Sequence, residues 1–590
     1  MTGVRIRAYG RRGTCPGRLF LCSMPPVVSR FRGVLQGRLT ASRWVALCAG
    51  ATVGLHLAAF ALMAWSESTA VGKAAFLLAW GLVNCFWLAL LRRPAIAAAL
   101  SLTLAAVLVL LSRFKHDVLF MTVNFVDVMI IDNDTLGFLL AVFPGLKSMV
   151  GVAVVLAVPV FGLLWWLDPL RVRFRTAALG GFTCLAVLTA LSFAAPHDRE
   201  EEFWNENYVS KFARSGAVAV TELMLRGLLE SDGSAADRLT TGAVGQCRAE
   251  QAPHIIMILD ESSFDASMVH GLKVPPDYAR RFASFDGRTR SFIVEGAGGP
   301  TWYTEYNVLA GLSARSYGRF AEFVTRVAAG RVERGLPQAL RRCGYKTFSL
   351  YPWLGAFLGA RAFQTAIGVD HFLDARDLGT AEVRPDSFYF DATARLIARE
   401  RGNGPLFFFV YTMANHFPWS YRFAPERLPQ WRDPGNAPEV DEYLRRQAMS
   451  AEDYAQFRAR LAQEFPDERF LIVRFGDHQP LFAKHIIDPT LDDGELGRRI
   501  AAFDPSYFTT YYAIDAVNFA PADLSLAIDK LDAPYLPLVV LEAAGLSLDP
   551  SFAEQKKILE RCKGVFYRCA GGAEARRFNR LLIDAGLIKG

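Results

Sequence analysis

Side chains that commonly bind metals follow three short apolar runs in the second half of the chain. They are Glu261 after residues 255–259, His416 after residues 407–411, and Asp477 with His478 after residues 471–475. Carboxylate oxygens and an imidazole nitrogen form a mixed ligand set that suits Mn²⁺, Mg²⁺ or Zn²⁺. These segments therefore predict a divalent metal site.

Thr301 is the candidate nucleophile. It follows the Gly-rich turn 296–300 and precedes a helix predicted over 302–312, so its hydroxyl is exposed near the positive end of the helix dipole. A metal ion touching this hydroxyl would explain how so weak a nucleophile becomes an alkoxide at neutral pH. Taken alone, Thr301 is more readily explained as a helix N-cap than as a nucleophile.

Each of the other candidates also has an ordinary structural explanation. His416 could be a hydrogen-bonded core histidine, Glu261 could pair with an arginine, and Asp477-His478 could be a plain loop pair. Their joint occurrence at the ends of apolar runs in one domain favours the site instead.

These residues need elements that bring them together. From residue 251 onward, short β-branched or aromatic runs alternate with helical stretches, and this alternation predicts an α/β domain around a mainly parallel sheet. Catalytic residues of such sheets lie just past the carboxyl ends of the strands. The predicted strands are 254–260, 289–294, 346–351, 406–412, 470–475 and 508–514.

The first third of the chain has a different character. The protein has 590 residues, of which 52% are hydrophobic, and its mean hydropathy of +0.19 is too high for a purely soluble protein. Apolar runs of roughly 17 to 25 residues span a bilayer as helices. Five such runs predict five spans: 44–65, 74–91, 95–112, 149–167 and 176–195.

Arginines orient these spans. Nine arginines and no acidic residue precede the first span, and further arginines follow the second and fourth, so these flanks belong in the cytoplasm. Five spans that start inside leave everything after residue 195 outside the cytoplasm. The same distribution accounts for the net charge of +7 without nucleic-acid binding, which we do not expect.

The resulting organisation has five parts. They are a basic cytoplasmic arm (1–43), a transmembrane domain (44–195), a juxtamembrane helix with a linker (196–250), a catalytic domain (251–546) and a C-terminal extension (547–590). The stretch 118–131 is too short and too polar to cross and is expected along the outer membrane interface. Few polar residues lie inside the spans, so we interpret them as an anchor and a platform for lipid access rather than a transport path.

Four motifs in this order resemble the membrane-anchored sulfatase-like transferases of the alkaline phosphatase superfamily. This family includes lipoteichoic acid synthases, phosphoglycerol transferases and phosphoethanolamine transferases. The motifs are residues 254–262, Pro300 to Tyr306, Asn415-His416-Phe417-Pro418 and Phe475-Gly476-Asp477-His478. The resemblance implies a bacterial inner-membrane protein with a sulfatase-like domain in the periplasm.

The resemblance also implies roles for individual residues. Glu261, Thr301, Asp477 and His478 would bind the metal, Thr301 would become a phosphothreonine, and His416 would hold phosphate oxygens. The donor would be a phospholipid, and the acceptor an envelope glycan or lipid. True sulfatases need Cys or Ser in a Cys-x-Pro-x-Arg setting, which the turn before Thr301 lacks, so phosphoryl chemistry is favoured over sulfate chemistry.

Departures from the family leave the transferred group open. The segment 349–363 corresponds to the part of lipoteichoic acid synthases that binds glycerol phosphate, and Trp353 and Arg361 are its candidate substrate-binding residues, although their spacing differs from the family pattern. Gly-Asp-His, in place of Ser-Asp-His, favours phosphoglycerol over phosphoethanolamine. Two other functions stay open: a phosphatase or phosphodiesterase of the same fold, and an inactive membrane sensor or scaffold.

Four of the nine cysteines are predicted outside the membrane, in an oxidising compartment. Cys562 and Cys569 are close enough in sequence to close a small loop, and we expect them to pair. The pairing of Cys247 with Cys343 stays open, because sequence does not give their separation.

Overall fold

The computed structural model describes residues 41–119, 121–130, 144–195, 203–232, 252–380 and 382–589, together with Gly137, Leu140, Glu201, Arg238, Leu239 and Cys247. These residues divide into two compact units. The helical unit contains the described residues up to Trp65 with 77–106 and 151–186, and the sheet unit contains the rest. Most of the predicted basic arm and most of the predicted linker at 231–249 lie outside the described residues.

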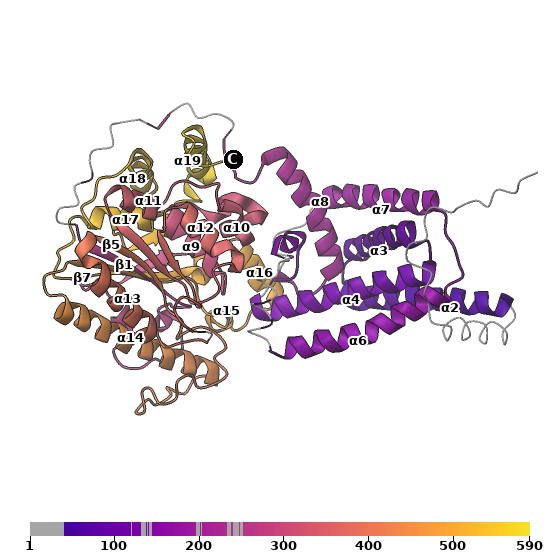
Figure 1. Cartoon of the computed structure of the whole chain (residues 1–590), viewed down its shortest axis with the longest axis horizontal. Helices are drawn as coiled ribbons and strands as arrows, with labels where there is room; N and C mark the ends of the chain where they lie inside the picture. The colour runs from indigo at the N-terminus through magenta and orange to yellow at the C-terminus, as the bar shows by residue number, and fades with distance from the viewer. Residues whose placement is uncertain are drawn as a thin grey trace, which may run out of the picture. The chain divides into compact units, whose positions relative to one another are not determined.

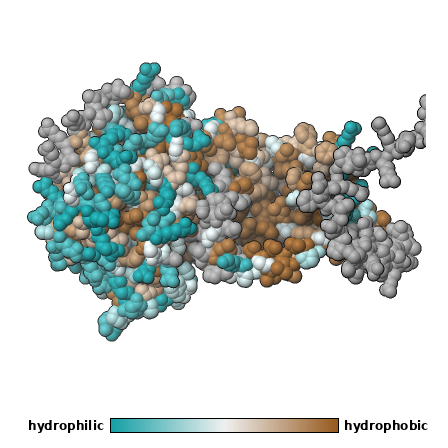
Figure 2. Space-filling model, viewed as in Figure 1, coloured by the Kyte–Doolittle hydropathy of each residue, from teal (hydrophilic) through white to brown (hydrophobic). Residues whose placement is uncertain are grey.

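Five long helices cover the predicted spans. They are α2 (Ala41–Ser66), α3 (Ala70–Leu91), α4 (Pro94–Leu119), α6 (Pro144–Leu167) and α7 (Phe174–Ala194). Among the described residues, α2, α3, α4 and α7 contain stretches of 21 to 24 residues that are long and apolar enough to cross a membrane. Figure 2 shows hydrophobic residues gathered on the surface of these helices, as lipid exposure requires.

The fifth predicted span falls on α6. The apolar stretch recognised in this helix is Val150–Trp165, which is shorter than the other four, and Pro159 lies inside it. Four candidate spans are therefore established by length and composition. The count of five, on which the predicted orientation depends, stays a prediction.

The sheet unit is built on one eight-stranded sheet (Figure 1), in the order β4-β3-β5-β1-β6-β7-β2-β8. The strands are β1 (His254–Asp260), β2 (Arg290–Ile293), β3 (Lys346–Leu350), β4 (His371–Leu373), β5 (Leu406–Tyr411), β6 (Phe470–Gly476), β7 (Thr509–Val517) and β8 (Lys530–Asp532). From β4 to β6 all neighbours are parallel. β7 runs antiparallel to both β6 and β2.

The sheet is mainly parallel, as the sequence predicts, and of the described strands β7 alone runs antiparallel to its neighbours. Six strands lie where the apolar runs predict them, and β4 and β8, each of three residues, are too short to give a sequence signal. Because β7 is antiparallel to both of its neighbours, β2 runs in the same direction as β6. The carboxyl ends of β1, β5, β6 and β2 therefore meet at one edge of the sheet.

Helices cover both faces of the sheet, and the side chains of β1 alternate between them. Ile255, Met257 and Leu259 belong to the core under α9 (Thr301–Ala310), α11 (Leu336–Arg342), α12 (Ala360–Ala366) and α17 (Leu536–Ala543). Ile256 and Ile258 belong to the core under α13 (Asp386–Glu400) and α14 (Pro438–Glu464). Figure 1 shows these two helical layers. A strand buried on both faces is a rigid base for polar residues at its end.

The stretch predicted to lie along the membrane interface is built into the sheet unit. Its helix η1 (Phe125–Ile130) contributes Val126, which is 2% exposed, to the main core. Asn124 Nδ2 donates to Glu322 Oε2 at 3.1 Å, and the Phe125 N–H donates to the Ser215 hydroxyl at 2.9 Å in α8 (Tyr208–Arg226). This segment is therefore part of the folded unit as well as a candidate for contact with lipid.

Candidate metal centre

Two adjacent parallel strands bring the predicted ligands together. Asp260 at the end of β1 pairs in register with Gly476 at the end of β6, so the next residues, Glu261 and Asp477, lie beside each other. The aligned edge of β2 leads through the Gly-rich turn to Thr301, the first residue of α9. The sheet thus gathers side chains that are more than 200 residues apart in sequence.

The structure brings Glu261, Thr301, Asp477 and His478 into one group, which we call the metal cluster. Ligand atoms of the two carboxylates and the imidazole all lie within 4.8 Å of one another, and all three side chains are buried. His478 Nε2 lies 3.2 Å from Asp477 Oδ2 and 3.7 Å from Glu261 Oε1. The Thr301 hydroxyl lies 3.3 Å from the same Nε2.

Hydrogen bonds orient this cluster toward a common centre. His478 Nδ1 lies 2.8 Å from the Gln479 carbonyl and donates to it, which leaves Nε2 as a lone-pair donor toward the other ligands. Asp477 Oδ1 accepts from the Ser262 and His478 N–H groups at 2.8 and 2.9 Å. The second oxygen, Oδ2, is buried and faces His478 Nε2, and no residue that the structure describes donates a well-aligned hydrogen bond to it.

A buried carboxylate oxygen without a partner is unfavourable unless something positive binds it. Burial, reinforced by the Asp477 carboxylate, raises the pKa of Glu261 well above its usual range, and burial also raises the pKa of Asp477. The donor set of two carboxylates, an imidazole and a hydroxyl matches the ligands of a divalent metal. The residues therefore fit the metal ion that the sequence predicts.

Gly476 fixes the geometry of the β6 end. A Cβ at this position would overlap the backbone carbonyl oxygen of Ser263, so no other residue fits without a backbone shift. Ser262 has a φ of 50°, which turns the chain sharply after Glu261. Asp260 is directed away from the cluster and accepts from the Tyr511 hydroxyl at 2.5 Å. Of these two adjacent residues, it is Glu261 whose carboxylate lies in the cluster.

His416 lies on the loop after β5. Its Nδ1 lies 2.7 Å from the Phe417 carbonyl and donates to it, and desolvation lowers its pKa to about 4. The imidazole is therefore neutral at pH 7, with Nε2 as an acceptor. Its ring lies 5.9 Å, centroid to centroid, from that of Trp353, so one of the two predicted substrate-binding residues borders His416.

Two residues that the sequence does not single out hold this loop. Asp386 accepts from the Met413 and Ala414 N–H groups at 3.0 and 2.9 Å. Arg446, which is fully buried, donates to the His416 carbonyl at 2.7 Å. An Asp at a helix start and an Arg within a charged helix carry no distinctive sequence signal, so only the fold identifies them.

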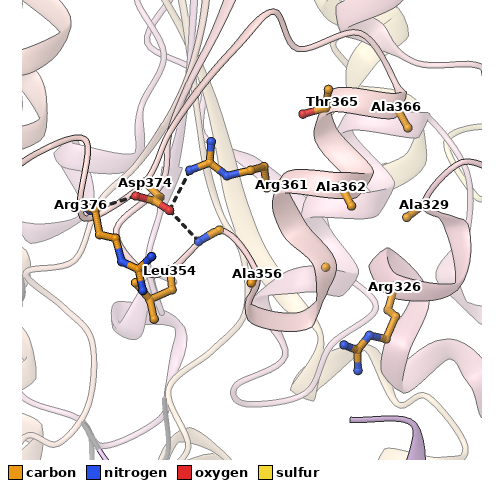
Figure 3. Close-up of a pocket in the computed structure, with 12 residues that line it drawn as sticks. Arg326, Ala329, Leu354, Ala356, Arg361, Ala362, Thr365, Ala366, Asp374 and Arg376 are labelled. Carbon is orange, nitrogen blue, oxygen red and sulfur yellow. Dashed lines mark hydrogen bonds and ion pairs between the residues drawn. The ribbon is translucent and has the colours of Figure 1, made fainter. Parts of the chain in front are cut away.

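Arg361 does not join the metal cluster. Its guanidinium donates to Asp374 Oδ2 at 2.7 Å, to Asp377 Oδ2 at 3.2 Å and to the Phe372 carbonyl at 3.0 Å. It lines a cavity that contains no member of the cluster (Figure 3). The two predicted substrate-binding residues thus lie in different surroundings.

The structure places all four cysteines that the sequence assigns to an oxidising compartment in disulfides. Cys562 pairs with Cys569 in the C-terminal extension, and Cys247 pairs with Cys343, which closes a loop of 96 residues. The second bond joins the end of the predicted linker to the segment after α11.

Part of the chain is similar to a protein family and to two curated proteins. Residues 253–495 match the family model described as Sulfatase. Over 258 residues the chain is 31% identical to the "Capsular polysaccharide biosynthesis protein RkpI" of Rhizobium meliloti (strain 1021), a match covering 41% of this chain and 45% of that protein. It is 25% identical over 287 residues to an uncharacterized protein of Haemophilus influenzae, covering 45% and 48%. The chain thus spans about half the length of the curated relatives it matches.

The phosphoglycerol transferase GacH of Streptococcus pyogenes, in complex with sn-glycerol-1-phosphate, is 16% identical, with a TM-score of 0.44, over 60% of this chain and 87% of that chain. The lipooligosaccharide phosphoethanolamine transferase A of Neisseria meningitidis is 13% identical, with a TM-score of 0.44, over 82% and 96%. Residues 253–495, which contain the whole strand-end cluster, therefore match the sulfatase family.

Proposed function

We propose that this protein is a membrane-anchored, metal-dependent transferase that moves a phosphoglycerol or phosphoethanolamine group from a phospholipid to an envelope glycan or lipid. The observation that carries the proposal is the position of the Thr301 hydroxyl, 3.3 Å from His478 Nε2 at the edge of a buried acidic cluster. A hydroxyl in this position is set up for activation as a nucleophile.

The reaction would proceed by two displacements at phosphorus. Thr301 Oγ attacks the phosphorus of the phospholipid, a bond forms between them, and the bond from phosphorus to the diacylglycerol oxygen breaks. The Thr301 hydroxyl loses its proton in this step, and the oxygen of the departing diacylglycerol gains one. An acceptor hydroxyl then attacks the phosphorus, the Oγ–phosphorus bond breaks, and the acceptor proton returns to Oγ.

Residues of this chain would support both steps. Glu261, Asp477 and His478 would hold the metal ion, which when bound would stabilise the alkoxide and the charge on the phosphoryl oxygens. His416 is neutral, with Nε2 as an acceptor, and could take the proton of the acceptor hydroxyl. Transfer would require the acceptor to reach phosphorus before water does.

Three observations support the choice of substrates and of phosphoryl chemistry. Four apolar helices give the chain access to lipid, which suits a phospholipid donor. The relative from Rhizobium meliloti is named for capsular polysaccharide biosynthesis, which supports an envelope glycan as the acceptor class. The turn before Thr301 contains no cysteine, which favours phosphoryl over sulfuryl chemistry.

One incubation distinguishes the candidate reactions. The full-length protein in lipid nanodiscs would receive phosphatidylglycerol or phosphatidylethanolamine labelled in the head group, with Mn²⁺ and an envelope glycan fraction. Label on the glycan supports transfer. Label released as free glycerol phosphate or phosphoethanolamine at the same rate with and without acceptor identifies a hydrolase. A protein that binds Mn²⁺ but turns over neither donor is an inactive sensor or scaffold.

We also propose that the sheet unit lies in the periplasm of a bacterial inner membrane. The proposal rests on the arginine-rich flanks and on α6 acting as a fifth span. An alkaline phosphatase reporter fused after Ala249 is expected to be active. An inactive reporter there, with an active one after Ser68, would mean that α6 does not cross.

A further inference from the structure

Helix α8 ends in an apolar segment that the sheet unit leaves exposed. Its large apolar side chains are Val220, Leu223, Met224 and Leu225, which are 42%, 45%, 80% and 79% exposed. Single exposed apolar residues are common on protein surfaces, whereas a contiguous group of this kind marks an interaction surface. We call these four side chains the apolar tip.

The apolar tip is held in place on both sides. Ala219, directly before it, is 2% exposed, and Leu229, shortly after it, is 5% exposed, and both belong to the core under α9. Between them, Glu222 Oε2 accepts from Arg319 Nε of η5 (Ala314–Phe323) at 2.8 Å. The fold therefore presents the apolar side chains in a fixed position, so they are not the frayed end of a helix.

The first turn of α8 is bound to the loop between α2 and α3. Glu67, which is fully buried, accepts from the Val209 N–H at 3.0 Å and from the Ser210 hydroxyl at 2.5 Å. The Asn207 N–H donates to the carbonyl of Ser66, the last residue of α2, at 2.8 Å. An acidic side chain at this position satisfies N–H groups that the first turn of a helix leaves open. Helix α8 therefore starts at the end of a candidate span.

The last turns of α8 are connected to the end of a second candidate span. Arg319, the partner of Glu222, lies one turn before Glu322 in η5. Glu322 Oε2 lies 3.5 Å from Nζ of Lys115, near the end of α4. All of these residues belong to the sheet unit.

The two span ends lie on the same side of the membrane, because α3 is a candidate span that returns between α2 and α4. Helix α8 is attached to the end of α2 at its start and, through η5, to the end of α4 at its other end. A helix attached in this way runs along the membrane surface rather than away from it.

We propose that the apolar tip inserts into the lipid bilayer on the side where α2 and α4 end. Aliphatic and thioether side chains suit the boundary between head groups and acyl chains, and the following residue, Arg226, suits lipid phosphates. A second copy of this chain is the other occupant that the test below distinguishes. The inference goes beyond the proposed function, because it holds whatever reaction the metal cluster carries out.

Photo-crosslinking identifies what the apolar tip contacts. p-Benzoylphenylalanine, which bonds to neighbouring C–H groups on irradiation, would replace Met224 or Leu225 in the full-length protein, in vesicles of phosphatidylethanolamine and phosphatidylglycerol. Leu57 of α2, which is 63% exposed, is the position of the positive control, and Phe285, which is 48% exposed in the turn before β2, is that of the negative control. Intact-protein mass spectrometry should show phospholipid adducts at both tip positions and at Leu57, and only background at Phe285.

Other adducts would overturn the proposal. A covalent dimer formed from the tip positions without phospholipid adducts would assign the surface to a second copy of the chain. Phospholipid adducts at Leu57 but not at Met224 or Leu225 would show that the tip faces water. Equal yields at the tip and at Phe285 would show that the adducts do not report insertion.

A charge placed in the tip tests what insertion does for the reaction, and this second test rests on the proposed function. Met224→Glu combined with Leu225→Glu should raise KM for phosphatidylglycerol in vesicles at least about threefold, while kcat for soluble bis(p-nitrophenyl) phosphate should stay within about twofold. Phe285→Glu is the matched control. An unchanged KM would show that insertion does not serve access to the donor. A protein that turns over no phospholipid would contradict the proposed function, whereas the crosslinking result would still decide insertion.

Discussion

The metal cluster and the cavity lined by Arg326, Arg361 and Arg376 differ in how their side chains are held. The cluster sits at the ends of fully buried strands, where backbone N–H groups fix Asp477 and a backbone carbonyl fixes His478. In the cavity, Arg326 and Arg361 lie on the short helices α10 (Val324–Ala328) and α12, and Arg376 lies in the loop after β4. Their side chains are partly or fully exposed. Chemistry at phosphorus needs fixed atoms, whereas recognition of a variable substrate tolerates longer and more mobile side chains.

Substitution of Thr301 should lower the activity more than any other change proposed here. If Thr301 forms the covalent bond as proposed, Thr301→Ala removes the nucleophile, so kcat should fall by at least about 10⁴-fold. Bound Mn²⁺, measured by mass spectrometry of the purified protein, should persist because Glu261, Asp477 and His478 remain. Thr490→Ala, at an exposed turn, should leave both values unchanged. Wild-type turnover in Thr301→Ala would remove Thr301 from the mechanism.

Trp353 is next to both regions in sequence or space, because its ring lies 5.9 Å from that of His416 and the following residue, Leu354, lines the cavity. Trp353→Ala should raise KM for the phospholipid roughly tenfold, consistent with the loss of aromatic contact area at a binding site. Its kcat should change less, and its bound metal should not change. Steady-state kinetics with the phospholipid donor in nanodiscs measures the changes in KM and kcat separately. A fall in kcat with an unchanged KM would place Trp353 among the groups acting at phosphorus.

The rigidity of the cluster depends on Gly476. Gly476→Ala forces a Cβ against the Ser263 carbonyl, so we expect a loss of roughly 1–3 kcal/mol in stability and weaker metal binding. Gly402→Ala is the matched control, because a Cβ there meets open space. Thermal unfolding with and without Mn²⁺ checks both effects. Equal melting temperatures for the two variants would show that this strand end can shift freely.

The smallest effect concerns Glu305, which links α9, the helix that begins at Thr301, to α12. It accepts from Gln364 Nε2 of α12 at 2.8 Å, and burial raises its pKa to about 7. In the folded protein it stays protonated up to about pH 7, whereas in the unfolded chain it ionises near pH 4.5. Unfolding between these values releases a proton, so its contribution to stability falls as pH rises through this window.

Glu305→Gln keeps the acceptor for Gln364 and removes this titration. The melting temperature of the variant relative to wild type should therefore rise between pH 5 and pH 8, by roughly 2–6 °C, as expected for 1–3 kcal/mol in a domain of this size. Calorimetry in detergent measures the difference at each pH. A constant difference would show that Glu305 titrates normally in the folded protein.

The sequence predicts strand ends more reliably than loop contacts. The apolar runs at 254–260 and 470–475 match β1 and β6 almost residue for residue, because fully buried strands require continuous hydrophobic sequence. The positions of Glu261, Asp477 and His478 follow from these strands. Thr301 lies near these residues because of the direction in which β2 runs. Pairing with β7 sets that direction, and no local sequence pattern reveals it.

Contacts between loops are less predictable. Arg361 precedes β4 in the sequence and Asp374 follows it. Nothing in the sequence distinguishes their pairing from that of many other arginines and aspartates. The stretch 118–131 is predicted from its composition as an interfacial segment, yet Asn124 and Val126 pack into the sheet unit. Its mixture of apolar and polar residues suits a domain surface as well as a membrane surface.

The central claim is that Thr301, activated within the metal cluster, carries the phosphoryl group. The most direct test is to incubate the full-length protein in nanodiscs with phosphatidylglycerol labelled in its head group and with Mn²⁺, to quench with acid, and to map the label by peptide mass spectrometry. We predict a phosphoglycerol adduct on Thr301 that an acceptor glycan discharges and that Asp477→Asn prevents. Turnover with no adduct on Thr301, or with the adduct on another residue, would contradict the account.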